Sequence, residues 1–328
     1  MRPDVFTVFL ALQTVLPART TAVDPFAFFR PSIVVSVDDR RQLDRGEAIA
    51  RVVSGSDREI AVFAAVRVDI DGDRLVAWTR HIAELKKSPY VLAIGRFSAP
   101  PRIEDLEGLT LEDEDLSAIR RCRPGDCGLK LTSAEMDRLE HTLVGAGGNW
   151  KPALQDAFRH IVLWRVQDYV ANGDTAPGFS SLLRHSPFLT SRLPQFTEYL
   201  DRYPHRPMAD VESFIYWSKE RLGGQPMIRV IHVGILRTAD GPLPDALVAG
   251  KEIFTTHYIN ASLGLTAIMR GGPGARNYLA YVNRSDIDVV RGVFGGLVRW
   301  FMERRLTSEA SGVLLGLRRR LESGDPDP

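Results

Sequence analysis

The chain has little of what most readily reveals a protein's activity. Its 328 residues include only two cysteines. No apolar run approaches the length of a membrane-spanning helix, which needs about 18 residues or more. Lysine and arginine (42) nearly balance aspartate and glutamate (41), so the net charge of +1 gives no sign of a nucleic-acid partner. Hydrophobic residues at 44% and charged residues at 25% are ordinary globular values, which excludes a disordered, collagenous or coiled-coil chain.

The familiar catalytic motifs are also missing. The sequence has no Gly-x-Ser-x-Gly elbow, no His-Glu-x-x-His helix, no P-loop and no Gly-x-Gly-x-x-Gly after a strand. Its seven histidines never fall at metal-ligand spacing within one element. We therefore expect no metal and no cofactor. These absences lower the hydrolase, metalloenzyme and nucleotide-dependent interpretations without excluding them, because catalytic groups need only be near in space.

The first 22 residues have the features of a secretory signal peptide. Arg2 gives a weakly positive start, Val5 to Leu12 is almost wholly apolar, and Pro17 ends the apolar region. Thr20 and Ala22 are small and lie two apart, as a signal peptidase requires. The alternative is an amphipathic helix that docks on the domain. Residues 1–22 are predicted to be removed on export, which places the protein in the periplasm or outside the cell.

The two cysteines fit an oxidising compartment. Cys122 and Cys127 flank the turn-forming pair Pro124-Gly125, which can bring the two sulfurs together. A disulfide closing a loop of about six residues should stabilise the fold by roughly 2 kcal/mol. Zinc is disfavoured because no second Cys or His pair lies nearby. Two buried free thiols in a cytosolic protein are the alternative.

The remaining chain predicts an α+β protein. Ala48–Val53 and Glu59–Val68 form a predicted hairpin, followed by a helix over Arg74–Lys87 capped by Asp71 or Asp73. The acidic stretch from Glu104 to Asp115 is interpreted as a solvated surface. Residues 132–204 are predicted to be an all-helical insertion that opens with the capping box of Thr132 and Glu135.

Short turns typical of β-hairpins then separate strands whose apolar residues alternate with a period of two. This pattern favours an antiparallel meander. The predicted strands are Ser213–Trp217, Met227–Arg237, Leu247–Asn260, Leu263–Met269 and Tyr278–Arg284. One long helix follows, with Gly292, Gly295 and Gly296 near its start. Because glycine destabilises a helix interior, we expect close packing or ligand contact there. Residues 323–328 are predicted to be a disordered tail.

This order of elements resembles the helix-grip fold of the START-like superfamily, which contains lipid-transfer domains and polyketide cyclases. The pattern is carried by Glu59–Lys87 and by Tyr278–Leu321 with its glycine-containing helix. The resemblance implies a curved antiparallel sheet around the C-terminal helix, with an apolar cavity between them. The domain would comprise residues 23–131 and 205–322. The strings CRPGDC and YWSKE also resemble those of uncharacterised exported bacterial proteins.

Polar residues within apolar strands are the candidate ligand-binding groups. His232 stands between branched aliphatic residues, and the long predicted strand carries Lys251, His257, Tyr258 and Asn260. By alternation Lys251 and His257 share one face, while Tyr258 and Asn260 share the other. Trp217 and Phe294 would supply aromatic wall, and Gly296 would leave room. The adjacent pair Lys219–Glu220 is interpreted as a surface charge pair.

Three functions fit these features. The first is a carrier of a hydrophobic small molecule, a lipid or terpenoid, in the bacterial cell envelope. The second is an enzyme that uses the same cavity, with His232 or His257 as acid–base and Tyr258 as hydrogen-bond donor. The third is an envelope interaction protein with a filled interior. No nucleic acid and no transmembrane span are expected, and peripheral membrane contact is left open.

Overall fold

A computed structural model describes residues 24–328, apart from 57, 124–126, 174–176, 222–223, 239–242, 273, 289–294, 325 and 327–328. The predicted signal peptide, residues 1–22, therefore lies outside the described residues. Within the described part, no helix combines the length and the apolar character that crossing a bilayer requires.

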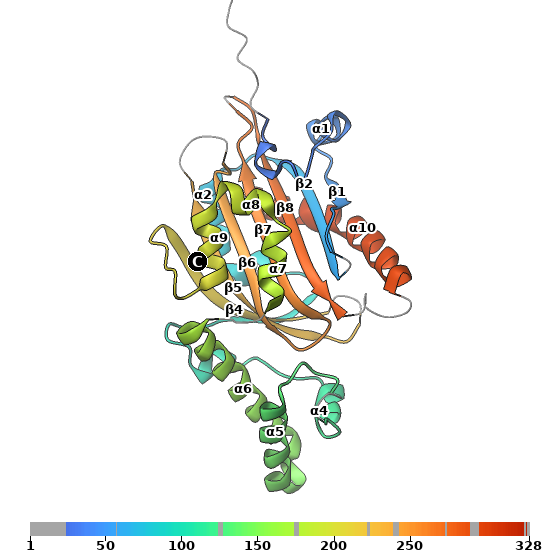
Figure 1. Ribbon diagram of the computed structural model, residues 1–328, viewed down its shortest axis with the longest axis vertical. Coiled ribbons are helices and arrows are strands. Elements are labelled where there is room, and N and C mark those ends of the chain that lie inside the picture. The colour runs from blue at the N-terminus through green and yellow to red at the C-terminus, as the bar shows by residue number, and fades with distance from the viewer. Residues whose placement is uncertain are drawn as a thin grey trace, which may run out of the picture.

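An antiparallel sheet of eight strands forms the centre of the described molecule (Figure 1). The strands are β1 (Ile49–Val52), β2 (Glu59–Val68), β3 (Val91–Arg96), β4 (Val211–Glu220), β5 (Met227–Arg237), β6 (Ala246–Thr255), β7 (Ile259–Met269) and β8 (Asn277–Ile287). Their order across the sheet is β1-β2-β8-β7-β6-β5-β4-β3. The early strand β2 thus pairs with the last strand β8, and β4 to β8 form the predicted meander.

Helices precede, interrupt and follow the strands. The α-helices are α1 (Val37–Asp44), α2 (Gly72–Arg80), α3 (Ile82–Lys86), α4 (Asp113–Ile119), α5 (Ser133–Ala146), α6 (Trp150–Asn172), α7 (Pro177–Arg184), α8 (Pro187–Arg192), α9 (Pro194–Arg202) and α10 (Gly295–Glu322). Short 3-10 helices are η1 (Ala27–Phe29), η2 (Ile103–Leu106) and η3 (Gly147–Asn149). Helices α5 to α9 lie within the predicted insertion, residues 132–204, although the division into domains stays a prediction.

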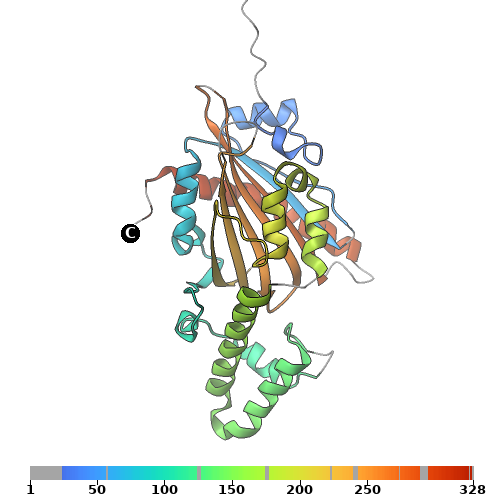
Figure 2. The ribbon, with the colours of Figure 1, turned by 60° about the vertical axis from the view of Figure 1, so that its left-hand side comes forward.

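The two faces of the sheet are covered by different parts of the chain (Figure 2). On the face that we call the insertion face, strand residues such as Val230, Ala249 and Leu265 pack against α6 to α9 and η1. On the opposite face, called here the α10 face, residues such as Ile231 and Val233 share a core with α2 and α10. The alternation of β-strand side chains produces this division, apart from a register shift between β5 and β6.

Several local predictions are confirmed. The hairpin of β1 and β2 pairs Ile49 with Ala65, and the side chain of Asp71 accepts a hydrogen bond from the Arg74 backbone N–H. The capping box of Thr132 and Glu135 opens α5. Cys122 and Cys127 form the predicted disulfide, with Cα atoms 4.5 Å apart.

Two predicted elements are wrong in extent. The helix expected over Arg74–Lys87 breaks at His81, where α2 ends and α3 begins. The strand expected over Leu247–Asn260 is two strands, β6 and β7, joined by a tight turn in which Tyr258 has a φ of 61°. The backbone reverses at this turn, so Lys251 lies on β6 whereas Asn260 lies on β7.

Candidate functional site

Two paired glycines leave the centre of the α10 face without side chains. Gly250 on β6 and Gly264 on β7 are direct partners in the register, and both are partly exposed although their strands are central. A Cβ atom added at Gly264 would come no nearer than 3.8 Å to Asn283 and Tyr281, and one at Gly250 would lie 3.4 Å from Ile231. Glycine in a strand interior commonly marks a close approach to the backbone. The pair therefore leaves the sheet backbone partly exposed here, and the space over it is bordered at ordinary van der Waals distance by the described side chains.

Both apolar and polar side chains surround this space. Ile231 and Val233 on β5 are buried and apolar. Val248, Thr266, Tyr281 and Asn283, on the same face of three central strands, are partly exposed. Apolar walls with a few polar groups are typical of small-molecule sites.

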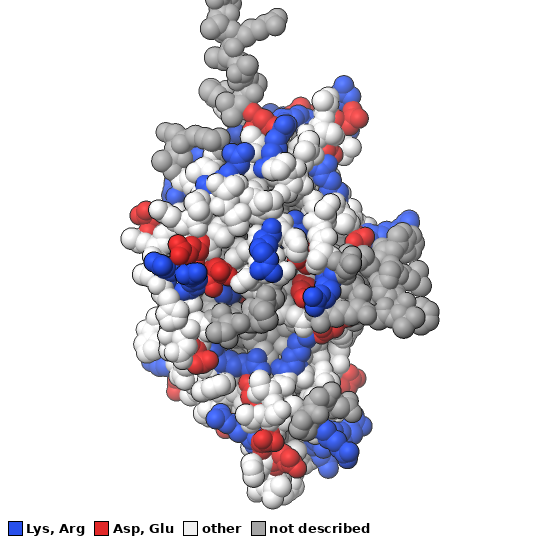
Figure 3. All heavy atoms as spheres, in the orientation of Figure 1, with Lys and Arg blue, Asp and Glu red and all other residues white. Residues whose placement is uncertain are grey.

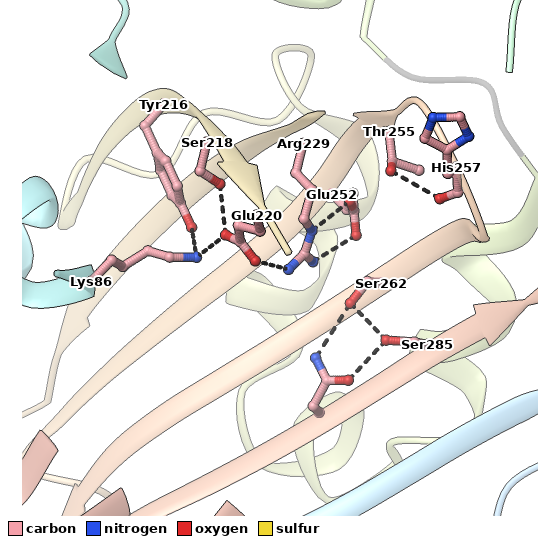
Figure 4. A network of polar contacts seen from close by, with 11 residues as sticks. Lys86, Tyr216, Ser218, Glu220, Arg229, Glu252, Thr255, His257, Ser262 and Ser285 are labelled. Carbon is pink, nitrogen blue, oxygen red and sulfur yellow. Dashed lines mark hydrogen bonds and ion pairs between the residues drawn. The ribbon is translucent and has the colours of Figure 1, made fainter. Parts of the chain in front are cut away.

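A charged network lies next to the glycines on the same face (Figure 4). Arg229 stands two residues before Ile231, and Glu252 two residues after Gly250, a displacement of roughly 7 Å along a strand. The Arg229 guanidinium donates to both carboxylate oxygens of Glu252, at 2.9 and 2.8 Å. It also donates to Glu220 at 3.2 Å.

Lys86 closes the other end of the network. Its Nζ donates to Glu220 Oε1 at 2.6 Å and to the Tyr216 hydroxyl at 3.3 Å. The Ser218 hydroxyl also donates to Glu220, at 2.7 Å. Helix α3 thus joins the sheet through a charge pair that is largely withdrawn from solvent, because the Glu220 side chain is only 5% exposed.

The electrostatics keep this network ionised. Burial on its own would lower the pKa of Lys86, but Tyr216 and Glu220 outweigh it and raise that pKa above its usual range. Burial would likewise raise the pKa of Glu220, yet Lys86 and Arg229 hold it well below its ordinary value. Burial raises the pKa of Tyr281, which therefore remains a neutral phenol. The network combines two cations and two carboxylates, so its net charge is zero.

Uncharged hydrogen bonds occur at the edge of the glycine pair. The hydroxyls of Ser262 and Ser285 lie 2.9 Å apart. Asn283 donates to Ser262 at 3.3 Å and accepts from Ser285 at 2.8 Å. These groups satisfy one another and add no charge to the site (Figure 4).

The sequence-predicted residue His232 lies on the insertion face, away from this space. The hydroxyl of Tyr169 is 2.8 Å from its Nδ1 and that of Tyr199 is 3.2 Å from its Nε2. Burial, with a smaller contribution from Lys251, lowers the pKa of His232 to about 3. The imidazole is therefore neutral and links the insertion to β5.

Lys251 and Trp217 also point to the insertion face. Lys251 Nζ donates to the Leu200 carbonyl at 3.0 Å and lies 4.4 Å from the centre of the Phe179 ring. Trp217 donates from Nε1 to the Asp105 carbonyl at 2.8 Å and is buried in the core beside α6. All these contacts hold helices or loops against the sheet.

The other predicted residues are dispersed. His257 Nε2 lies 3.1 Å from Asp115, Tyr258 is exposed on its turn, and Asn260 is exposed at the start of β7. Phe294 lies outside the described residues; Gly296 is in α10, but its surroundings are not described. His232 and Lys251 are register partners on adjacent strands, but the other described members of the predicted set lie apart from them, and the ligand-binding role stays a prediction.

One surface interpretation holds in part and another is wrong. Most acidic residues of 104–115 are exposed as predicted, but Asp115 is buried, where it accepts a hydrogen bond from Gln225 and contacts His257. Lys219 and Glu220 are both buried and point to opposite faces: Lys219 pairs with Glu112 at 2.6 Å, whereas Glu220 joins the network. The period of two along β4 was a signal for this, since Tyr216, Ser218 and Glu220 share one parity.

A separate groove runs along the edge strand β1. Its volume is about 760 Å³, and it lies between β1, α1 and the middle of α10. The lining is mixed, with the charged side chains of Asp39, Arg51, Glu303 and Arg304 beside apolar residues of β1. None of the predicted ligand-binding residues lines it.

Charges of both signs are scattered over the face that carries α7 to α9, without a dominant sign in this view (Figure 3). Among the described residues, no group of three or more His, Cys, Asp or Glu side chains is arranged to hold a metal ion.

Comparisons with known proteins add little. No model of a protein family matches the chain, and no curated protein matches it. TTHA0849 from Thermus thermophilus aligns with a TM-score of 0.26 and 12% identity, over 41% of this chain and 86% of that one. The di-domain ARO/CYC BexL from the BE-7585A biosynthetic pathway aligns with a TM-score of 0.24 and 10% identity, over 93% and 97%. Likenesses of this size assign neither fold nor function.

Proposed function

We propose that the protein binds a hydrophobic small molecule, a lipid or terpenoid, against the α10 face of its sheet. The observation that carries the proposal is the paired glycines Gly250 and Gly264, partly exposed on central strands and bordered by apolar residues. Their backbone would contact the hydrocarbon, and the network of Arg229 and Lys86 would bind a polar end.

We further propose that the architecture is a helix-grip arrangement. The connectivity supports this: β2 is followed by α2 and α3, β4 to β8 form a meander, and α10 comes last. Leu314 and Leu321 of α10 share a core with Leu75 of α2 on one face of the sheet. The ligand would lie between that helix layer and the sheet.

A location in the periplasm or outside the cell is part of the proposal. The disulfide between Cys122 and Cys127 supports it, because such bonds persist mainly in oxidising compartments. If residues 1–22 are a signal peptide, protein recovered from its host should begin near Val23. An intact Met1 in the bulk of the protein would contradict export.

Binding is favoured over catalysis by the state of the carboxylates. Glu220 accepts from Lys86, Ser218 and Arg229, and both oxygens of Glu252 accept from Arg229. Neither carboxylate is thus placed to take a proton from a substrate, as a general base must.

The test is ligand capture by the intact protein. Native mass spectrometry of protein purified from its own envelope should show a co-purified hydrophobic molecule, and Nile red should bind after that molecule is extracted. Gly264→Leu should abolish Nile red binding while the circular dichroism spectrum stays unchanged. Gly145→Leu is the control, because no described atom lies within 4 Å of a Cβ at that position of α5.

The same experiment can reject the proposal. If the wild type carries no ligand and binds no Nile red, the carrier and enzyme functions both fail, and the interaction-protein function remains.

A further inference from the structure

The charged network on the α10 face is balanced within itself. Lys86 and Arg229 carry two positive charges, and Glu220 and Glu252 carry two negative charges. Each cation lies within 3.2 Å of a carboxylate. A ligand that reaches this network therefore meets polar groups without a net field of either sign.

The network has N–H donors that its own carboxylates do not use, but it has no surplus positive charge to bind an anion. A guanidinium has five N–H donors and an ammonium three. The described residues accept three bonds from Arg229 and two from Lys86. Free N–H groups can thus bind a hydroxyl or carbonyl oxygen. A carboxylate, in contrast, would be desolvated beside Glu220 and Glu252 with no surplus cation to offset that cost.

Apart from the exposed Arg96, which lies over the Phe214 ring at 4.1 Å from its centre, the other described groups near the network on this face are uncharged. Tyr281 and Tyr216 are phenols, Asn283 is bound to two serines, and Thr266 is a hydroxyl. From α10, Leu306 and Ala310 pack against Ile60 and Val62 on the same face. None of these uncharged groups would compensate an additional anion.

We infer that the site selects uncharged hydrophobic molecules that carry a hydroxyl or carbonyl group, and rejects their carboxylate counterparts. The inference rests on the proposed function, because it concerns the ligand of the same site. Glu252 and Glu220 are the residues that determine this selectivity. They cancel the charge of Arg229 and Lys86, which alone would form an anion site.

The test uses two probes that differ only in the polar end. Dodecanol and dodecanoic acid, the latter ionised at neutral pH, compete with Nile red for the wild-type protein. We expect dodecanol to bind at least about tenfold more tightly. Glu252→Gln keeps the shape but leaves one net positive charge, so the preference should shift toward the acid by about tenfold.

Further variants separate the effect of charge from the effect of a disturbed fold. Arg229→Gln/Glu252→Gln restores the balance and should restore the preference for dodecanol. Glu220→Gln gives the same net charge as Glu252→Gln and replaces it if that variant fails to fold. Glu212→Gln is the matched control: it removes a carboxylate from β4, the strand of Glu220, where Glu212 pairs with Arg80 instead. Glu212 lies eight residues, roughly 26 Å, along the strand from Glu220, beyond the screening length of about 8–10 Å.

The outcomes are distinct. Tighter or equal binding of dodecanoic acid by the wild type overturns the neutral-ligand inference and leaves the carrier function standing. A preference unchanged in both Glu252→Gln and Glu220→Gln also overturns it. If neither probe displaces Nile red, or Nile red itself does not bind, the carrier function fails and the inference fails with it.

Discussion

Glycines in the strands have different roles on the insertion face and on the α10 face of the sheet. On the insertion face, a Cβ at Gly234 would lie 3.3 Å from the Tyr199 ring, so this glycine admits a helix. On the α10 face, a Cβ at Gly264 would meet the described side chains of Asn283 and Tyr281 only at 3.8 Å, an ordinary contact distance, and this glycine is partly exposed. A strand glycine thus indicates proximity to the backbone, and only the fold tells whether protein or ligand is to fill it.

Both faces bury paired charges, since Lys219 and Glu112 form an ion pair on the insertion face. Lys251 on the insertion face is bound by a backbone carbonyl and lies against the Phe179 ring. On the α10 face, Lys86 and Arg229 are bound by carboxylates. The α10 face differs in joining its charges into one balanced network of two cations and two carboxylates.

The largest effect is expected from a substitution that breaks the charged network. Arg229→Ala removes one of its cations and leaves Glu252 buried without its ion-pair partner, which should lower the free energy of unfolding by about 3–5 kcal/mol. Urea denaturation monitored by circular dichroism measures it. Arg80→Ala, which breaks the exposed pair with Glu212, should cost less than about 1 kcal/mol. Equal losses would contradict the burial of the network.

The next effect contrasts the two glycines. Gly234→Leu should destabilise the protein by up to about 3 kcal/mol, because the added side chain collides with Tyr199 and Phe196. Gly264→Leu should cost less, since its Cβ would make only ordinary van der Waals contacts with Asn283 and Tyr281 on a partly exposed part of the sheet. Thermal unfolding of both variants measures the difference. A Gly264→Leu variant as unstable as Gly234→Leu would show that the α10 face is filled.

The smallest expected effect is a pH dependence of stability that differs between the two faces. His232 is neutral in the fold, with its pKa lowered from 6.5 to about 3. The unfolded chain therefore binds the extra proton first, and stability falls as the pH drops below 6.5. Between pH 7 and pH 5 the loss should be about 2 kcal/mol. His232→Gln should remove that loss, as urea denaturation at both pH values would reveal.

The α10 face should respond only in stronger acid. The pKa of Glu220 lies below its ordinary value of 4.5, so its contribution is complete above that pH and declines below it. Glu220→Gln should therefore leave the change in stability between pH 7 and pH 5 as it is in the wild type. A variant that abolished the change would contradict the separation of the two faces.

Much of the fold could be predicted from periodicity and turns. The hairpin of β1 and β2, the meander and the long final helix all follow from local pattern, as does the disulfide between Cys122 and Cys127. The tight turn at Tyr258 could not be predicted, because no glycine or proline marks it. Missing it joined two strands and misplaced Lys251 relative to Asn260.

The candidate site was less accessible from sequence. Alternation on β5 separates Arg229, Ile231 and Val233 from His232, but it does not say which set the insertion covers. A polar residue among aliphatic ones, such as His232, suggests a ligand-binding group, but its partners are tyrosines distant in the chain. Arg229 and Glu252 lie on adjacent strands with a register shift between them, so their pairing appears only when the strands are aligned.

The pairing of β2 with β8 has a consequence for the order of folding. Glu59 and Asp286 are register partners, so closing this seam brings together two parts of the chain separated by most of its length. Such distant contacts form slowly, since their loop entropy is lost before they stabilise anything. During synthesis the sheet stays incomplete until β8 has emerged. A nascent chain with an unsealed sheet is open to chaperones, and it reaches its native state only after nearly all of it has been made.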